Sequence, residues 1–272
     1  MIRTIVLILT FMVVLPVFAE EKEGGIIGTG VIGRITALDQ FEVSGMRFDF
    51  APDIELKGVR ALDDLRMGMT LALSTGRDGE AWQIKSLQHM PVLSGPVTAP
   101  GEVMGVPVAG ALPASGAVQV DGFWSESGIV ASRITEFAED AAQVSGIYDG
   151  HSQVGQVPVQ GGDLSEFSPG QTLTVLGRFV DGTLVAETVM QGPFMDGSPD
   201  LVLLEGFFQP MPRSDTLSLH GIAVASATAE QDIDPDEPVR RCALHGRTDF
   251  LRSALTTSEE EMVNSFCVSA TN

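Results

Sequence analysis

Apolar and polar residues alternate along most of the chain, in short runs that are separated by turn-forming residues. Residues 172–176 and 184–189 are two such runs, and the dipeptide Asp181-Gly182 stands between them. A period of two places successive side chains on opposite faces of a strand, and Asp-Gly favours a tight hairpin turn. Residues 168–190, which begin with a turn at Pro169-Gly170, therefore predict a β-hairpin.

The same pattern occurs four times along the chain, at intervals of about 50 to 60 residues. Each copy opens with a strand that contains a glycine, and a second strand follows with a further glycine that is shifted by one position in the third copy. The first set is found in the run Gly28–Gly33 and at Gly95, Gly146 and Gly206, and the second set is Gly45, Gly105, Gly155 and Gly221. A repeat of this length with four or five short strands predicts tandem β modules. We place them at residues 20–90, 91–139, 140–192 and 193–272.

A unit of five short strands must close into a small barrel or pack against a neighbour, because an open sheet leaves unpaired edges. The glycines fit this prediction, since they mark positions where a strand bends sharply or passes close to another backbone. Between the second and third predicted strands of the first module, residues 58–65 predict one helical turn, with Leu62 and Leu65 facing the end of the barrel.

The fourth copy departs from the pattern after its opening strands. An acidic loop at 231–237 is followed by a predicted strand at 239–244. Apolar residues at helical spacing then follow, and Ser258 with Glu261 forms a capping box ahead of Phe266, so we predict a short α-helical cap at the C-terminus. Terminal repeats often need such a cap to cover their exposed end.

Cys242 and Cys267 are the only cysteines, and both lie in the last copy. An even pair in an exported protein predicts a disulfide that ties down the C-terminal tail. The alternative is a reactive Cys242 thiol that is activated by His245, three residues further on.

The repeats resemble a family of exported bacterial proteins made of tandem modules, usually catalogued as a domain of unknown function. The resemblance rests on the strand glycines, on the spacing Leu65-x-x-Gly68, and on the Asp-Gly turns that precede an apolar-Ala-x-x-apolar strand. It is best over 25–87 and 142–190, weaker over 91–137 and partial after 201. It implies a mainly β fold of small OB-like barrels and carries no catalytic residues.

The N-terminal residues have the pattern of a secretory signal peptide. Arg3 precedes an apolar run from Ile5 to Val14, and small side chains before Glu20 predict cleavage after Ala19, so that residues 1–19 are removed. An uncleaved membrane anchor is the alternative, but the apolar run is short for a bilayer. We therefore expect a periplasmic or secreted protein without stable membrane insertion after cleavage.

The mature chain is strongly acidic. Loss of Arg3 leaves 15 basic residues against 36 acidic residues, a net charge of about −21. Such a surface repels phosphate backbones and anionic headgroups, so we expect no nucleic acid among the partners.

Motifs for catalysis or for cofactors are weak. The four histidines have no metal-ligand spacing, no G-x-S-x-G elbow is present, and the pattern Gly28-x-Gly30-x-x-Gly33 lacks a following helix. Asp232, Asp234 and Asp236 are spaced like calcium ligands, but Glu237 occupies the position of the required turn glycine, which leaves at most a weak cation site. Trp82 and Trp124 form a candidate ligand face, the alternative being that they are partly buried residues of a barrel or of an interface between modules.

These observations favour a non-enzymatic binding or scaffolding protein of the bacterial envelope, without a cofactor, whose partner is an envelope protein or a glycan. Modules in series favour such a role because weak contacts repeated along an array add through avidity. Two alternatives are a hydrolytic or redox enzyme with a site assembled between modules, and a protein that responds to divalent cations through the loop 231–237.

Overall fold

The protein is mainly β. The computed structural model describes residues 29–78, 81–137, 141–194, 201–212, 217–224, 239–245 and 266–269. In these residues the regular structure consists of strands and two short 3-10 turns, with no α-helix. The strands form sheets of nine, ten and three strands.

The strands of module 1 form a cycle that is closed by pairings and by one link along the chain. Its elements are β1 (Thr29–Ala37), β2 (Glu42–Val43), β3 (Met46–Arg47), β4 (Asp49–Lys57), the 3-10 turn η1 (Leu62–Asp64), β5 (Thr70–Asp78) and β6 (Ala81–His89). β1 pairs with β2, β2 pairs with β3, and only Phe48 separates β3 from β4, so β3 and β4 together count as the third strand of the module, β5 as the fourth and β6 as the fifth. β4 then runs parallel to β6, β6 pairs antiparallel with β5, and β5 returns to β1.

Modules 2 and 3 repeat this cycle. Module 2 contains β7 (Leu93–Ala99), β8 (Glu102–Val103), β9 (Val106–Ala109), β10 (Ala117–Ser125) and β11 (Gly128–Glu136). Module 3 contains β12 (Ala142–Ile147), β13 (Gln153–Val154), β14 (Val157–Gln160), the 3-10 turn η2 (Leu164–Glu166), β15 (Thr172–Val180) and β16 (Thr183–Gln191). In both modules the third strand is parallel to the fifth. A single bridge between Tyr148 and Val154 joins the first two strands of module 3.

Module 4 retains more of the pattern than the sequence suggested. Its strands are β17 (Leu201–Gly206), β18 (Gln209–Pro210), β19 (Leu217–Leu219), β20 (Ile222–Val224), β21 (Val239–His245) and β22 (Phe266–Ser269). β18, β19 and β20 form a meander, and β21 pairs with both β17 and β22. β17, β21 and β22 therefore correspond to the first, fourth and fifth strands of the other modules.

The predicted helical cap is wrong at Phe266 and Cys267, which lie in strand β22. The local apolar spacing favoured a helix, but β21 offers an unpaired edge on the side away from β17, and pairing with that edge satisfies the backbone of residues 266–269. The capping box at Ser258 and Glu261 lies outside the described residues.

Several local predictions are confirmed. The helical turn expected within 58–65 is η1, and Leu65 directly after it is buried at 4% exposure. Asp181 and Gly182 both have positive φ, as a type I′ hairpin turn requires, and they join β15 to β16. The strand expected at 239–244 is β21.

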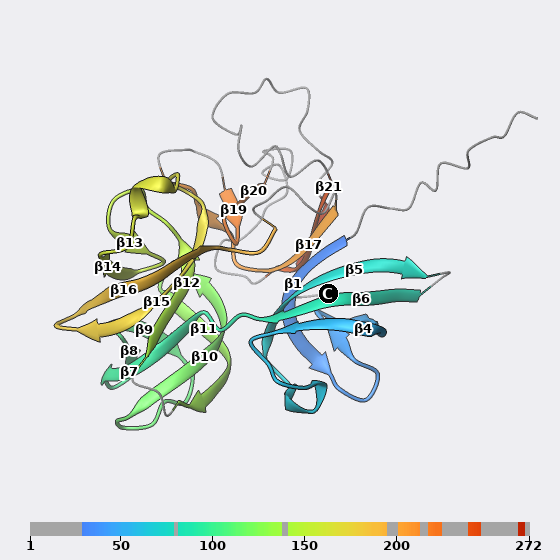
Figure 1. The fold of residues 1–272 in the computed structure, drawn as a ribbon, viewed down its shortest axis with the longest axis horizontal. Coiled ribbons are helices and arrows are strands. Elements are labelled where there is room, and N and C mark those ends of the chain that lie inside the picture. The colour runs from blue at the N-terminus through green and yellow to red at the C-terminus, as the bar shows by residue number, and fades with distance from the viewer. Residues whose placement is uncertain are drawn as a thin grey trace, which may run out of the picture.

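First strands join the modules in pairs. β1 of module 1 runs parallel to β17 of module 4, and β7 of module 2 runs antiparallel to β12 of module 3. Buried side chains of modules 2 and 3 form one apolar cluster, whereas Ile32 and Ala72 of module 1 pack with Val202 and Leu204 of module 4. Figure 1 shows β17 and β21 alongside β1, with β7 to β16 gathered in the other half of the molecule.

Candidate functional site

A tight turn between two short strands lies against the first strand in every module, and it joins β2 to β3, β8 to β9, β13 to β14 and β19 to β20. Ser44-Gly45, Met104-Gly105 and His220-Gly221 all have positive φ at both positions, as type I′ turns require. In module 3 the loop between the paired residues Val154 and Val157 begins with Gly155, and only this residue has positive φ. A type II′ turn places its glycine first, and this explains the shift of one position in the third copy.

The first residue of each turn lies directly over the glycine of the first strand. A Cβ atom at Gly33 would overlap Ser44, and one at Gly95 would overlap Met104. A Cβ at Gly206 would lie 3.2 Å from Nε2 of His220. The strand glycines are therefore needed because a turn side chain of the same module occupies the space above them.

Module 3 has no such side chain, and Trp124 of module 2 takes its place. The Trp124 indole overlaps the position of a Cβ at Gly155, and its Nε1 lies 3.0 Å from that of a Cβ at Gly146. Nε1 donates a hydrogen bond of 2.6 Å to the Ser145 carbonyl. Trp124 is only 7% exposed, and its side chain is buried between modules 2 and 3.

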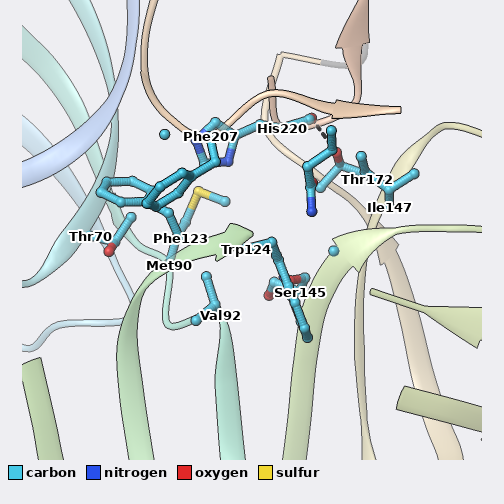
Figure 2. Close-up of a pocket in the computed structure, with 13 residues that line it drawn as sticks. Thr70, Met90, Val92, Phe123, Trp124, Ser145, Ile147, Thr172, Phe207 and His220 are labelled. Atoms are coloured by element: carbon cyan, nitrogen blue, oxygen red, sulfur yellow. Dashed lines mark hydrogen bonds between the residues drawn. The ribbon is translucent and has the colours of Figure 1, made fainter. Parts of the chain in front are cut away.

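All four modules meet at a small cavity beside Trp124 (Figure 2). Its lining comes from module 1 (Thr70, Met90), from the start and the fourth strand of module 2 (Val92, Phe123, Trp124), from module 3 (Ser145, Gly146, Ile147, Thr172) and from module 4 (Gly206, Phe207, Gln209, His220). The volume of ≈ 30 Å³ gives room for about two water molecules, since each needs about 10–15 Å³ on this scale. The cavity is therefore too small for an organic ligand unless the modules move.

Among the described residues of this lining, His220 is the ionisable one. Its Nε2 donates a 2.7 Å hydrogen bond to the Glu205 carbonyl, and its ring meets Phe123 edge-on with centroids 5.8 Å apart. The residue as a whole keeps partial exposure, but the ring lies among neighbouring side chains. Burial lowers the pKa of His220, and the hydrogen bond to the Glu205 carbonyl opposes this effect.

A second polar group, centred on Asp121, joins modules 1 and 2. Asp121 is completely buried, and its Oδ1 accepts hydrogen bonds from the Thr70 amide at 3.0 Å and from Nε2 of His89 at 2.7 Å. Its Oδ2 accepts no hydrogen bond in the described part of the chain and faces the Arg133 guanidinium at 3.6 Å. The Gly122 amide donates to Thr70 Oγ1 at 3.0 Å. These contacts hold the fourth strand of module 2 against the start of β5.

Replacing Asp121 with alanine is expected to destabilise the protein by about 3 kcal/mol, because it leaves the Thr70 amide and His89 without their buried acceptor. Urea unfolding followed by circular dichroism measures the change. Glu126→Ala, on the exposed turn of the same hairpin, is the control and is expected to change stability by less than about 0.5 kcal/mol. Equal effects of the two substitutions would contradict a structural role for Asp121.

The residues singled out in the sequence lie in different parts of the fold. Trp82 is half-buried against the apolar cluster of module 1, away from Trp124 in the lining. Cys242 and Cys267 are directly opposite one another in the antiparallel pair β21–β22. Asp232, Asp234 and Asp236 lie outside the described residues. Among the described side chains, no group of three or more His, Cys, Asp or Glu residues is placed to hold a metal ion.

Sequence reasoning missed the polar residues of the module junctions. Glu205, Asp121 and His220 stand at strand or turn positions where the other copies carry apolar, small or hydroxyl side chains. The sequence did offer one signal: a charged residue stands at a repeat position that is uncharged in the other copies. Such a residue indicates a contact with another module, because a buried charge requires a partner.

None of the described segments is a helix of sufficient length and apolarity to cross a bilayer. Comparison of the chain with family models, with curated proteins and with solved structures found no match.

Proposed function

We propose that this chain is an exported, non-enzymatic binding or scaffolding protein built from four OB-like β-barrels. The cycle of pairings supports the barrel assignment, because it runs from the first strand through the second, third, fifth and fourth strands and back to the first. The third and fifth strands are parallel in modules 1, 2 and 3. A small five-stranded barrel closed in this way fits the OB-like class.

The observation that carries the proposal is the location of the buried polar residues. Asp121 binds His89 across the junction of modules 1 and 2, and Glu205 binds Arg34 and Ser44 across the junction of modules 4 and 1. Both carboxylates are therefore used to fix one module on another. A rigid arrangement of this kind suits a protein that presents several surfaces at fixed positions to a partner.

The surface charge limits the classes of partner. Small OB-like barrels bind ligands with their second and third strands and the adjacent loops. Exposed residues of these strands in module 1 include Asp53 and Glu55, the second of which pairs with Lys57 at 3.3 Å, and the loop between β15 and β16 carries Asp181. A neutral glycan or a basic protein of the envelope matches such a surface, whereas nucleic acid does not.

Affinity capture tests the proposal. The mature protein, residues 20–272, is immobilised and exposed to an envelope extract, with a protease-treated extract as a second arm that separates a glycan from a protein. Saturable, stoichiometric retention of one component is the expected result. Failure of every fraction to bind, or chemical conversion of a component that is in large molar excess over the protein, would favour the enzyme alternative.

N-terminal sequencing tests the predicted cleavage site. The sequence of the exported protein is expected to begin at Glu20.

The disulfide gives a further prediction. Directly opposite residues of an antiparallel pair have Cα atoms about 4.5–5.5 Å apart, which is within the range that a disulfide spans. We expect the unreduced protein to show no reactive thiol, and the double substitution Cys242→Ser with Cys267→Ser to destabilise module 4 by about 3 kcal/mol. Thiol labelling and urea unfolding are the measurements. Labelling of either cysteine without a reductant would revive the alternative of a reactive thiol.

A further inference from the structure

His220 connects module 4 with two other modules through a single turn. Its ring meets Phe123 of module 2, and its carbonyl accepts a hydrogen bond from Thr172 Oγ1 of module 3. The same turn packs closely on module 3, because a Cβ at Gly221 would lie 2.8 Å from the Gly170 carbonyl oxygen. Figure 2 shows His220 between Phe207 and Thr172 at the edge of the junction cavity. The imidazole thus lies where modules 2, 3 and 4 are held together.

The surroundings of the His220 ring favour the neutral imidazole. Nε2 donates to a carbonyl oxygen, so this nitrogen carries the proton and Nδ1 is the unprotonated nitrogen. In the described part of the chain, the hydrogen bond from Nε2 is the one that the His220 ring forms. Burial lowers the pKa of His220 below its usual value of about 6.5.

The charged groups on the elements around His220 form ion pairs or hydrogen bonds with residues other than His220. On β17, the Glu205 carboxylate binds Arg34 of β1 and Ser44. On β10, Asp121 binds His89 of β6 and faces Arg133 of β11. At the start of β15 the nearest polar group is the hydroxyl of Thr172, and Arg178 of that strand pairs with Glu187 in solvent. None of these groups is positioned to neutralise a protonated His220.

We propose that protonation of His220 in mildly acidic solution releases module 4 from modules 2 and 3 and opens the junction cavity. The parallel pairing of β17 with β1 is retained, so modules 1 and 4 move together. The hydrogen bond between His89 and Asp121 does not involve module 4, and it therefore serves as the remaining link between modules 1 and 2. This inference concerns the fold itself and does not depend on the identity of a binding partner.

The direction of the effect follows from linkage. Docking lowers the pKa of His220, so the released state takes up the proton first as the pH falls below about 6.5. The contribution of the neutral imidazole to docking is fully present above that pH, and the equilibrium constant of docking falls by up to tenfold for each pH unit below it. The loss ends where the docked state becomes protonated as well. Acid therefore opens the junction, and a return to neutral pH closes it.

Tryptophan fluorescence tests the proposal on the intact mature protein. Trp82→Phe leaves Trp124, which lines the cavity, as the only tryptophan. As the pH is lowered from 8 to 5, we expect the Trp124 emission to shift to the red and its quenching by acrylamide to increase. Both changes reverse on return to pH 8. Emission and quenching that stay constant over this range would overturn the proposal.

Variants of two junction residues identify the responsible group. His220→Asn in the same background removes the titration and keeps a favourable Asn-Gly turn, so Trp124 is expected to stay protected at pH 5. An unchanged acid transition in this variant overturns the proposal. If Trp124 is already exposed at pH 8 in His220→Asn, the variant Thr172→Val provides the test instead. Loss of its hydrogen bond to the His220 carbonyl weakens docking, so a transition at higher pH supports the proposal, and an unmoved transition overturns it.

Discussion

Replacing Trp124 with alanine is expected to destabilise the protein by about 3–5 kcal/mol, the cost of removing a large buried aromatic side chain. The indole is 7% exposed and fills the space above Gly146 and Gly155, so its loss leaves a void between modules 2 and 3. The Ser145 carbonyl also loses its 2.6 Å hydrogen bond from Nε1. Equilibrium unfolding in urea, followed by circular dichroism, measures the loss. A cost below about 1 kcal/mol would show that Trp124 does not hold the two modules together.

A double-mutant cycle with Gly155→Ala separates the contact from other effects. The alanine is strained by the positive φ of residue 155 in either background, and in the wild-type background it also overlaps the Trp124 ring. Because the backbone strain cancels in the cycle, the coupling energy reports the overlap alone. We expect Gly155→Ala to cost at least about 1 kcal/mol less when residue 124 is alanine. Trp82→Ala, which removes a half-buried indole outside the junction, is the control and is expected to show no coupling.

The strands and turns were predictable because local residues determine them. The Asp181-Gly182 turn and the repeated x-Gly turns require positive φ, and glycine or a small polar residue signals this requirement in the sequence. The alternation of residues in 172–180 similarly reflects a strand with one buried face. These features depend on neighbours a few residues away along the chain, so they could be predicted from the sequence alone.

The module junctions were not predictable from the same pattern because they depend on contacts between distant residues. Trp124 fills the position above Gly155 only because β7 pairs with β12, and neither glycine nor tryptophan signals this pairing. Phe266 and Cys267 were assigned to a helix from local spacing, whereas the edge of β21, over twenty residues earlier, determines their conformation. The glycines of the first strands were noticed, but their cause required the fold: a turn side chain lies above Gly33, Gly95 and Gly206, and the Gly155 backbone and Trp124 lie above Gly146.

Replacing Glu205 with alanine is expected to destabilise the protein by about 2–3 kcal/mol and to loosen module 4 from module 1. The carboxylate is 4% exposed, and its Oε2 accepts hydrogen bonds from Ser44 Oγ at 2.7 Å and from the Arg34 amide at 3.0 Å. Its Oε1 lies 2.9 Å from Nε of Arg34. Arg34 is 45% exposed, so water stabilises it after the substitution and keeps the cost below that of a fully buried pair.

The exposed pair Arg178–Glu187 provides the control for this prediction, because it has the same chemistry at 3.2 Å but exposures of 69% and 60%. Glu187→Ala is expected to cost less than about 0.5 kcal/mol, as solvent and salt screen such pairs. Glu205→Gln keeps an acceptor for Ser44 and the Arg34 amide and loses the charge, so its cost is expected to lie between those of the two alanine variants. Hydrogen exchange of β1 and β17 locates the effect, and a Glu205→Ala variant with unchanged protection in both strands would contradict the role of Glu205 in joining modules 1 and 4.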